Sequence, residues 1–446
     1  MTTQHPYIPT TESEEQKMLE AIGVQAFEEL ITIIPSELRV ESKHGLSPGL
    51  SEVEVSSELQ HLAALNNLAT AGICFHGGGV YDHYTPEVVK AIAMRSEFYT
   101  AYTPYQAEVS QGTLQVMYEF QSLICELSGM EVANASMYDG ASAAAEACSL
   151  AINTTQMTRI LLPETLNPNI REVIETYLRN RSVEFVTIAS RNGRVDLDSL
   201  MGESEAAAAV VVQSPNVLGL VEDWAAIRRT LASDKTLLIA YADPLVLGIQ
   251  ESPGALGADI YVGEGQSLGI PFSYGGPYLG LMAAKEQYKR RLPGRIAGRT
   301  VDKDGKQGFV MVLRTREQDI RREKATSNIC TNQGLMALWA TTYLTLLGKN
   351  GFQRIARMCF NNSQYLGRSI AGLPGYELPF GFEYLKEFVV RSPVAANSVV
   401  REAETSGFNL GTLSWQGEDL LQIAVTESRT KDEMDRLVTV LGEIVQ

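Results

Sequence analysis

Seven short runs of apolar residues between Glu131 and Ala284 constrain the fold of this 446-residue chain most strongly. Several runs are nearly continuous in Val, Ile, Leu and Ala, which is the pattern of strands that are buried on both faces. Segments with helical spacing lie between most of them, and this alternation is typical of a mostly parallel, doubly wound sheet. The predicted strands are Val132–Ala135, Ile160–Leu162, Val183–Ile188, Ala208–Val212, Leu237–Tyr241, Ile260–Val262 and Leu279–Ala283.

The segments on either side of this α/β region have other patterns. Residues 1–65 predict a helical arm, with helical spacing in Glu14–Ile22 and Ala26–Ile33 followed by a polar connector at Val40–Leu50. Residues 66–310 form the predicted large α/β domain, which ends in a polar stretch at Thr300–Gly308. Residues 311–446 predict a smaller α+β domain, whose expected elements are Leu335–Leu347, Phe388–Arg391, Leu420–Val425 and Lys431–Val445.

Charge and composition exclude several classes of function. The net charge is −16, and the main basic cluster, Arg314–Lys324, is interleaved with acidic residues, so a nucleic-acid partner is not expected. No apolar stretch reaches the ~20 residues of a membrane helix. Met1–Gln16 is polar and lacks a signal-peptide core, so we expect a cytoplasmic location. The scattered cysteines and histidines show no C-x-x-C or H-x-x-x-H spacing, so no metal site is predicted.

Three segments follow predicted strands, where ligands bind in open parallel sheets. Ser136–Ala143 opens a helix with small residues around Gly140, which favours an anion site, although a tight strand–helix connection explains the same residues. Asp243 precedes a proline and either pairs with a protonated pyridine nitrogen or caps a turn. Gln266 lies in Gly263–Gly269, which on its own is a glycine-rich turn.

Longer motifs extend over most of the chain and give a specific resemblance. The chain resembles the N-terminal half, or separate alpha subunit, of the P-protein of the glycine cleavage system. The motifs that carry the resemblance are Tyr7–Thr10, FHGGGVYDHYTP (Phe75–Pro86), EFYTAYTPYQAEVSQGTLQ (Glu97–Gln115), ANASMYDGASA (Ala133–Ala143), QSPNVLGLVED (Gln213–Asp223), ADPLVLG (Ala242–Gly248), VGEGQSLGIP (Val262–Pro271) and REQDIRREKATSNICTNQ (Arg316–Gln333).

The resemblance implies fold type I of the pyridoxal-phosphate enzymes. It places Gln266 where the partner (beta) subunit has the lysine that forms a Schiff base with the cofactor. An amide nitrogen is not nucleophilic, so Gln266 cannot form that bond. Asp243 falls at the pyridinium-pairing aspartate, and Ser136 and Gly140 fall in the phosphate turn. The resemblance thus implies a vestigial site in this chain and pyridoxal phosphate on the beta subunit.

The resemblance also implies the reaction and its participants. Together with the beta subunit, in an α2β2 complex, the chain is expected to decarboxylate glycine, the pyridoxal ring accepting the electrons left as CO2 departs. The aminomethyl group would pass to the lipoyl arm of the H-protein.

A tyrosine-rich loop is the first candidate for this chain's own contribution to a shared active site. Tyr102, Thr103, Tyr105 and Gln106 offer rigid aromatic walls with hydroxyl and amide donors, which suit a small amino acid and a polar cofactor. The same loop also suits packing at a subunit interface. His76, beside three consecutive glycines, is a further catalytic candidate, although a lone histidine is more often structural.

A polar segment after the basic cluster is the next candidate. Ser327, Asn328, Thr331 and Asn332 carry hydroxyls and amides that would bind the phosphate of the partner's cofactor. Thr331 or Asn332 would equally serve as the N-cap of the helix predicted from Leu335.

Two other functions fit the same sequence. The chain could be a self-sufficient pyridoxal-phosphate enzyme that uses another lysine, with Lys285 and Lys324 as the candidates. It could also be a non-catalytic scaffold subunit.

Overall fold

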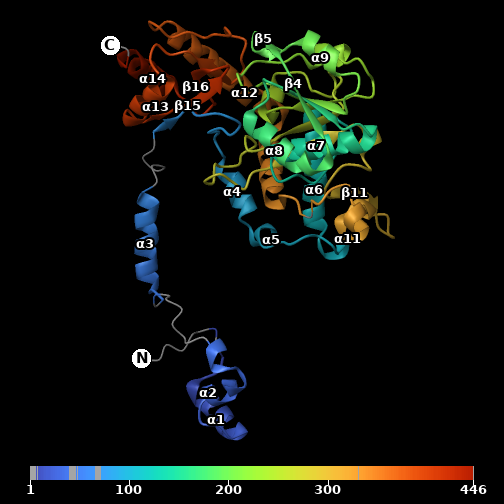
Figure 1. The fold of residues 1–446 in the computed structure, drawn as a ribbon, viewed down its shortest axis with the longest axis vertical. Coiled ribbons are helices and arrows are strands. Elements are labelled where there is room, and N and C mark those ends of the chain that lie inside the picture. The colour runs from blue at the N-terminus through green and yellow to red at the C-terminus, as the bar shows by residue number, and fades with distance from the viewer. Residues whose placement is uncertain are drawn as a thin grey trace. The chain divides into compact units, whose positions relative to one another are not determined.

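The computed structural model describes residues 7, 9–39, 47, 49–65, 72–329 and 331–444. The chain divides into two compact units, residues 1–69 and 70–446 (Figure 1). The described part of the first unit is helical, as predicted; its helices are α1 (Glu12–Ile22), α2 (Phe27–Leu30) and α3 (Glu52–Ala64). Thr11 and Glu14 form a capping box at the start of α1, and Gly23 ends the helix with φ 83. Most of the connector predicted over Val40–Leu50 lies outside the described residues.

A seven-stranded sheet forms the centre of the second unit. Its strand order is β2-β10-β9-β8-β7-β3-β4. The five strands β9, β8, β7, β3 and β4 are parallel to one another. At the other end of the sheet, β10 is antiparallel to both of its neighbours, β9 and the edge strand β2. Each of the seven predicted runs overlaps one of these strands, so the predicted fold class is confirmed. The strands are β2 (Val132–Ala133), β3 (Arg159–Pro163), β4 (Glu184–Ile188), β7 (Ala209–Gln213), β8 (Leu237–Tyr241), β9 (Ile260–Glu264) and β10 (Gly280–Ala284).

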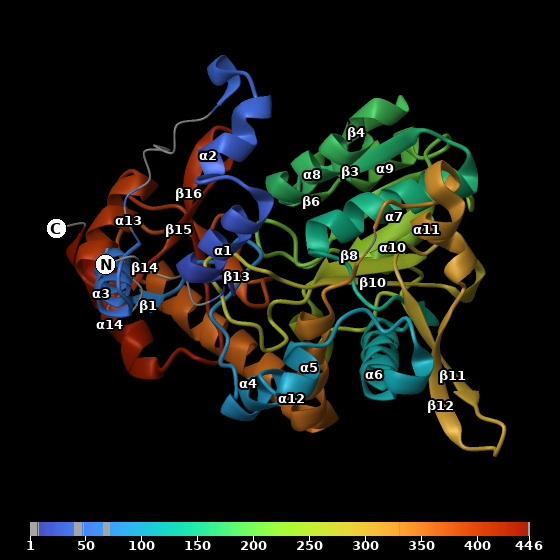
Figure 2. The ribbon, with the colours of Figure 1, turned by 90° about the horizontal axis from the view of Figure 1, so that it is seen from below.

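Helices cover both faces of this sheet, with α7 and α8 on one side and α6 and α12 on the other (Figure 2). Successive side chains of one strand therefore enter different cores: in β8, Leu237 and Ile239 pack towards α7, and Leu238 and Ala240 pack towards α12. The helices of the second unit are α4 (Glu87–Ala93), α5 (Ser96–Tyr99), α6 (Gln111–Ser128), α7 (Gly140–Thr155), α8 (Pro168–Leu178), α9 (Leu197–Glu203), α10 (Trp224–Thr230), α11 (Gln318–Arg321), α12 (Gly334–Ala371), α13 (Ala396–Thr405) and α14 (Lys431–Glu443).

A smaller antiparallel sheet, in the order β13-β16-β15, packs against α13 and α14. Its strands are β13 (Glu387–Val390), β15 (Gly411–Trp415) and β16 (Glu418–Ala424), and the predicted strands Phe388–Arg391 and Leu420–Val425 are thereby confirmed. The long helix α12 runs between the two sheets and breaks at Gly348. Beside this sheet, β1 (Ile73–Cys74) pairs with β14 (Phe408–Asn409), a contact between distant segments that sequence analysis missed.

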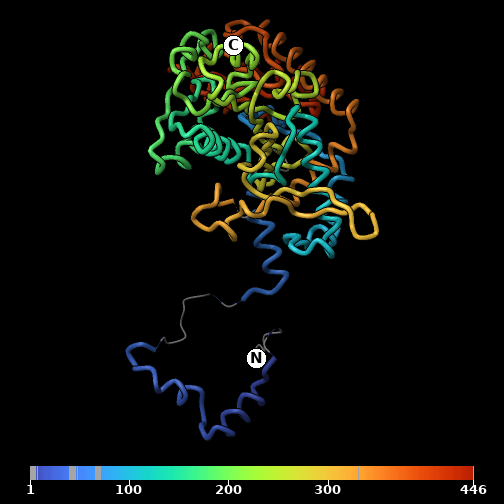
Figure 3. Tube along the Cα trace, turned by 90° about the vertical axis from the view of Figure 1, so that its right-hand side faces the viewer, coloured from blue at the N-terminus to red at the C-terminus, as the bar shows by residue number. Residues whose placement is uncertain are grey.

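The polar stretch Thr300–Gly308 has a regular structure. It contains the turn of a hairpin formed by β11 (Ile296–Val301) and β12 (Gln307–Val312), which projects from the second unit (Figures 2 and 3). Ala297 and Phe309 of the hairpin pack on α6. A shorter hairpin joins β5 (Ser190–Arg191) to β6 (Arg194–Val195). The division of the second unit at residue 310 stays a prediction. No helix in the described ranges is both long and apolar enough to cross a bilayer.

Candidate functional site

The three strand-end segments singled out in the sequence meet at one cavity of about 290 Å³. It lies at the carboxyl ends of β8 and β9, beside the start of α7. Asp139, Asp243 and Glu264 each contribute a carboxyl group to its wall, and Lys386 comes from the small-sheet side. We call it the strand-end cavity. Its position is the one expected of a ligand site in an open parallel sheet.

Carboxyl groups of this chain occupy the backbone donors at the start of α7. The N–H of Gly140 donates to Glu264 Oε2 at 2.9 Å, and the N–H of Ser142 donates to Asp139 Oδ1 at 2.7 Å. Glu264 Oε1 also accepts the N–H groups of Gln266 and Leu279, at 3.0 and 3.1 Å. Burial raises the pKa of Glu264 to about 8, against the opposing effect of these donors. A phosphate at this helix start would have to displace a buried side chain.

Asp243 already has a cationic partner. The ammonium of Lys386, a residue that is only 3% exposed, donates to Asp243 Oδ2. Ser267 Oγ and the N–H of Leu245 both donate to Asp243 Oδ1 at 3.0 Å, so Asp243 also caps the turn that follows it. Burial alone would raise the pKa of Asp243, but Lys386, His83 and these hydrogen bonds outweigh it and hold the pKa below its ordinary value.

Gln266 is 2% exposed and uses its whole amide inside the protein. Its Oε1 accepts the N–H of Tyr81 at 2.9 Å, and its Nε2 donates to the carbonyls of Tyr81 and Ile270 at 3.0 and 2.8 Å. These bonds tie the segment after the three glycines to the turn after β9. In this chain Gln266 is a buried cross-link between two loops.

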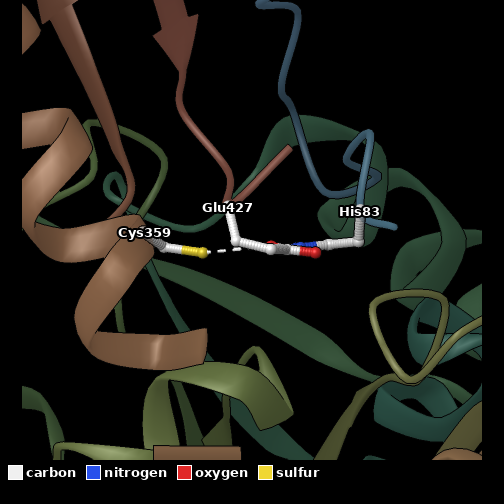
Figure 4. Close-up of side chains that lie close together, drawn as sticks. All are labelled: His83, Cys359 and Glu427. Atoms are coloured by element: carbon white, nitrogen blue, oxygen red, sulfur yellow. Dashed lines mark hydrogen bonds and ion pairs between the residues drawn. The ribbon is translucent and has the colours of Figure 1, made fainter. Parts of the chain in front are cut away.

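His83, Glu427 and Cys359 lie close together (Figure 4), and none of the three lines the strand-end cavity. His83 Nδ1 is 2.7 Å from Glu427 Oε2, and Cys359 Sγ donates to the same oxygen at 3.4 Å. Lys386 Nζ lies 3.1 Å from the other ring nitrogen of His83. Burial opposes ionisation of Glu427, but the bonds from His83 and Tyr84 lower its pKa to about 2. Hydrogen bonding accounts for this cluster, and the nearby ammonium makes it unsuitable for a metal ion.

A second cavity, of about 170 Å³, joins the tyrosine-rich loop to the start of α12. Tyr102 and Thr103 line one side, Thr331 and Asn332 line the other, and the buried Arg295 also lines it. We call it the tyrosine-loop cavity. It brings together residues of two segments that the sequence singled out separately.

The start of α12 differs from the prediction that Thr331 or Asn332 caps it. Gln333 is the N-cap residue and makes no side-chain cap, while the side chain of Asn332 donates to the carbonyl of Ala135 at 3.0 Å. The N–H of Gln333 donates to Ser136 Oγ at 3.0 Å. The N-cap prediction was wrong because Asn332 instead bonds a carbonyl of a segment distant in sequence; Ser136, which the resemblance placed in a phosphate turn, accepts the N–H of Gln333.

The remaining predicted residues lie outside both cavities. His76 packs against Gly411 of β15, and Gln106 is exposed just before a short turn of helix. Ser327 Oγ donates to the buried Glu146 of α7 at 2.9 Å, and Asn328 is exposed. Tyr105 borders the tyrosine-loop cavity through its hydroxyl, which accepts from Arg295 Nη2 at 3.3 Å.

Sequence analysis missed several charged residues of these sites, among them Glu264, Lys386, Glu387 and Arg295. Glu264 stands two positions before Gln266, and an acid at a predicted ligand site was a usable signal. Lys386 comes from the small-sheet region, and Arg295 lies in the connection between β10 and β11. Neither belongs to a local pattern that points to a site.

The fold is shared with other solved proteins of low sequence identity. Glutamate decarboxylase of Lactobacillus brevis matches with a TM-score of 0.67 at 12% identity, covering 94% of this chain and 96% of that one. A NifS-like protein of Rickettsia africae matches with a TM-score of 0.63 at 13% identity, covering 84% and 99%. The architecture, with its cavity at the strand ends, is that of the fold type I class of pyridoxal-phosphate enzymes.

Closer relatives define the family within this class. A family model described as glycine cleavage system P-protein matches residues 5–441. A probable glycine dehydrogenase (decarboxylating) subunit 1 of Prosthecochloris aestuarii is 49% identical over 442 residues, 98% of this chain and 100% of that protein. A crystal structure of an inhibitor-bound glycine decarboxylase (P-protein) matches with a TM-score of 0.89 at 40% identity, covering 99% of this chain and 100% of that one. The chain belongs to the glycine cleavage system P-protein family, as its motifs predicted.

Proposed function

We propose that this chain is the alpha subunit of a two-subunit glycine decarboxylase of the glycine cleavage system. The observation that carries the proposal is its similarity, over 98% of its length, to proteins named as subunit 1 of glycine dehydrogenase (decarboxylating). That name implies a second subunit. We further propose an α2β2 assembly in the cytoplasm, with glycine as the substrate and the lipoyl group of the H-protein as acceptor of the aminomethyl group.

The strand-end cavity of this chain does not fit pyridoxal phosphate. An amide without nucleophilic character, Gln266, stands where a lysine is needed. Glu264 occupies a backbone donor that a phosphate would use, and Lys386 occupies the carboxylate of Asp243 that a pyridine nitrogen would use. We therefore assign the cofactor to the beta subunit, where it would accept the electrons left by departing CO2.

The tyrosine-loop cavity is our candidate for this chain's share of the active site. Tyr102 is 81% exposed in this chain, so its ring is available to a partner surface. Tyr102 would wall a small amino acid against water, with Tyr105 beside it through the bond from Arg295, while the hydroxyls of Thr103 and Thr331 would orient the amino acid by hydrogen bonding. We keep Gln106, His76, Ser327 and Asn328 as weaker candidates because they line neither cavity.

Co-expression with the beta subunit tests the assignment. We expect glycine–CO2 exchange only in the mixture of the two subunits. Borohydride reduction of the loaded complex should attach the pyridoxyl group to a peptide of the beta subunit. A pyridoxyl group trapped on this chain, or exchange activity of this chain alone, would overturn the proposal.

Among the described residues, no suitable lysine for a self-sufficient enzyme lines the strand-end cavity. Lys285 pairs with Asp259 at 2.7 Å and Lys324 is exposed; neither lines the cavity. Lys386 does line it, but its ammonium is held by Asp243.

The scaffold alternative is tested by Tyr102→Ala and Thr331→Ala in the assembled complex, with Tyr177→Ala on α8 as an exposed control outside both cavities. A shared active site predicts loss of exchange activity in the first two variants with assembly retained. Activity equal to that of the control would favour a scaffold.

A further inference from the structure

Arg295 is a buried guanidinium that forms no direct ion pair among the described residues. It is 3% exposed, and within the described ranges no carboxylate lies at ion-pair distance from it. Its single side-chain hydrogen bond goes to the hydroxyl of Tyr105, at 3.3 Å, and its Nε has no partner. Charged groups are almost never fully buried unless they are paired, so we expect the Arg295 guanidinium to bind an anion.

Hydrogen bonds hold the backbone that carries Arg295. The carbonyl of Arg295 accepts the N–H of Ala135 at 2.8 Å, and the carbonyl of Pro293, two residues earlier, accepts from Asn134 at 3.0 Å. The next carbonyl along, of Gly294, accepts from Arg316 at 3.0 Å. An anion would meet a preorganised donor here.

The start of α12 supplies further donors on the same cavity. Gly334 and Leu335 line it, and their N–H groups belong to the first turn of the helix, where no intrahelical acceptor exists. The N-cap residue Gln333 provides no side-chain cap. Thr331, exposed at the rim, and Thr103 add hydroxyl groups. A buried arginine, two hydroxyls and a helix start converge on one space of about 170 Å³.

A second arginine, Arg314, lies with Arg295 at the Tyr105 ring, and one carboxylate is close to the pair. Arg314 and Arg295 both stack on the ring of Tyr105, at 5.7 and 5.5 Å from its centroid. The nearby carboxylate of Glu317 lies 4.0 Å from Arg314 and is part-buried. Burial raises the pKa of Glu317, and the positive charge of Arg295 is the first of the effects that oppose the rise. Stacking on the half-exposed ring of Tyr105 does not explain why Arg295 is buried while its Nε lacks an acceptor.

We infer that Arg295, with Thr103, Thr331 and the start of α12, binds an oxyanion in the tyrosine-loop cavity. This inference deepens the proposed function and rests on it for the source of the anion. The oxyanion is the phosphate of the cofactor carried by the partner subunit or the carboxylate of the amino-acid substrate. Arg suits either group because its planar fork donates two parallel hydrogen bonds.

Variants of Arg295 in the full two-subunit complex distinguish the two sources. Arg295→Gln removes the charge, Arg295→Lys keeps the charge but not the fork, and Arg299→Gln on the same hairpin is a matched control because Arg299 is exposed. For a phosphate ligand, Arg295→Gln should weaken pyridoxal phosphate binding about tenfold or more and leave the KM for glycine at saturating cofactor unchanged. For a carboxylate ligand, the KM for glycine should rise by the same factor and cofactor binding should be unchanged. Arg295→Lys should lie between wild type and Arg295→Gln.

A measurement on the chain without its partner separates this inference from the proposed function. Inorganic phosphate or acetate, titrated at constant ionic strength, should raise the unfolding temperature of the wild type and of Arg299→Gln but not that of Arg295→Gln. If this holds while the complex shows no glycine chemistry, the oxyanion site stands and the proposed function fails. The inference is overturned by two results together. Neither anion stabilises the wild type, and the complex assembled with Arg295→Lys has wild-type values of both the Kd for pyridoxal phosphate and the KM for glycine. Because those two outcomes do not depend on Arg295→Gln, a folding failure of that variant leaves the test intact.

Discussion

Replacing Glu264 with glutamine tests whether Glu264, which accepts a backbone N–H at the start of α7, is protonated in the folded protein. Burial raises the pKa of Glu264 to about 8, whereas its ordinary value is 4.5. Between these values the folded protein holds a proton that the unfolded chain has released, so the free energy of unfolding falls as the pH rises. Each pH unit in this interval lowers it by about 1.4 kcal/mol, and the whole interval by about 5 kcal/mol.

Glu264→Gln removes this titration and nearly keeps the shape of the side chain. Its amide NH2 must face one of the backbone donors that Glu264 now accepts, so the variant is expected to be less stable at low pH. That offset does not depend on pH. The stability difference between the two proteins should therefore change by about 5 kcal/mol in favour of the variant between about pH 4.5 and pH 8.

Urea unfolding of the full chain at several pH values measures this change, with the exposed Glu205→Gln as a control for loss of one negative charge. The control should follow the wild type. If Glu264→Gln also runs parallel to the wild type across the whole interval, Glu264 is ionised in the native protein throughout, held so by its three N–H donors, and the reasoning from burial is refuted.

Three further substitutions test the cross-links around the strand-end cavity by unfolding free energy. Gln266→Ala should cost about 3 kcal/mol or more, because it leaves buried groups of Tyr81 and Ile270 without partners; a loss below about 1 kcal/mol would contradict the cross-link. Lys386→Met should cost about 3 to 5 kcal/mol by leaving the Asp243 charge buried and unpaired, and adding Asp243→Asn should recover part of it; no recovery would contradict the ion pair as the cause. Gly269→Ala should cost about 2 to 4 kcal/mol, because φ is +85 and the new Cβ would lie 2.7 Å from a ring carbon of the buried Tyr343; wild-type stability would show that the loop adjusts freely.

The large sheet was predictable because strands that are buried on both faces consist of nearly continuous runs of apolar residues. Leu237–Tyr241 is fully apolar apart from its terminal hydroxyl and became β8 with the predicted bounds. The convergence of the strand ends was predictable for the same reason, since topology places successive carboxyl ends at one edge. Short elements were not: β1 has two residues, and its pairing with β14 depends on a contact between segments far apart in sequence.

The side-chain partners at the candidate sites were harder to predict than the positions of the sites. Asp243, which the sequence singled out, lines the strand-end cavity, but its partner Lys386 comes from a region more than a hundred residues away. Ser136, placed in a vestigial phosphate turn by the resemblance, accepts the N–H of Gln333, from a segment almost two hundred residues further on. Side-chain pairing across distant segments has no local pattern, and a single sequence without relatives does not reveal it.

The charged and polar groups at the strand-end cavity have partners within the chain itself. Without such partners, Asp243 would be a buried unpaired charge and the first N–H groups of α7 would lack acceptors, and each of these is destabilising. Lys386 supplies the cation and Glu264 the acceptor, so contacts within the chain stabilise this cavity. The tyrosine-loop cavity shows the opposite balance, because Arg295 is buried and its Nε has no partner among the described residues. This imbalance is the observation that led us to propose the oxyanion site there rather than at the strand ends.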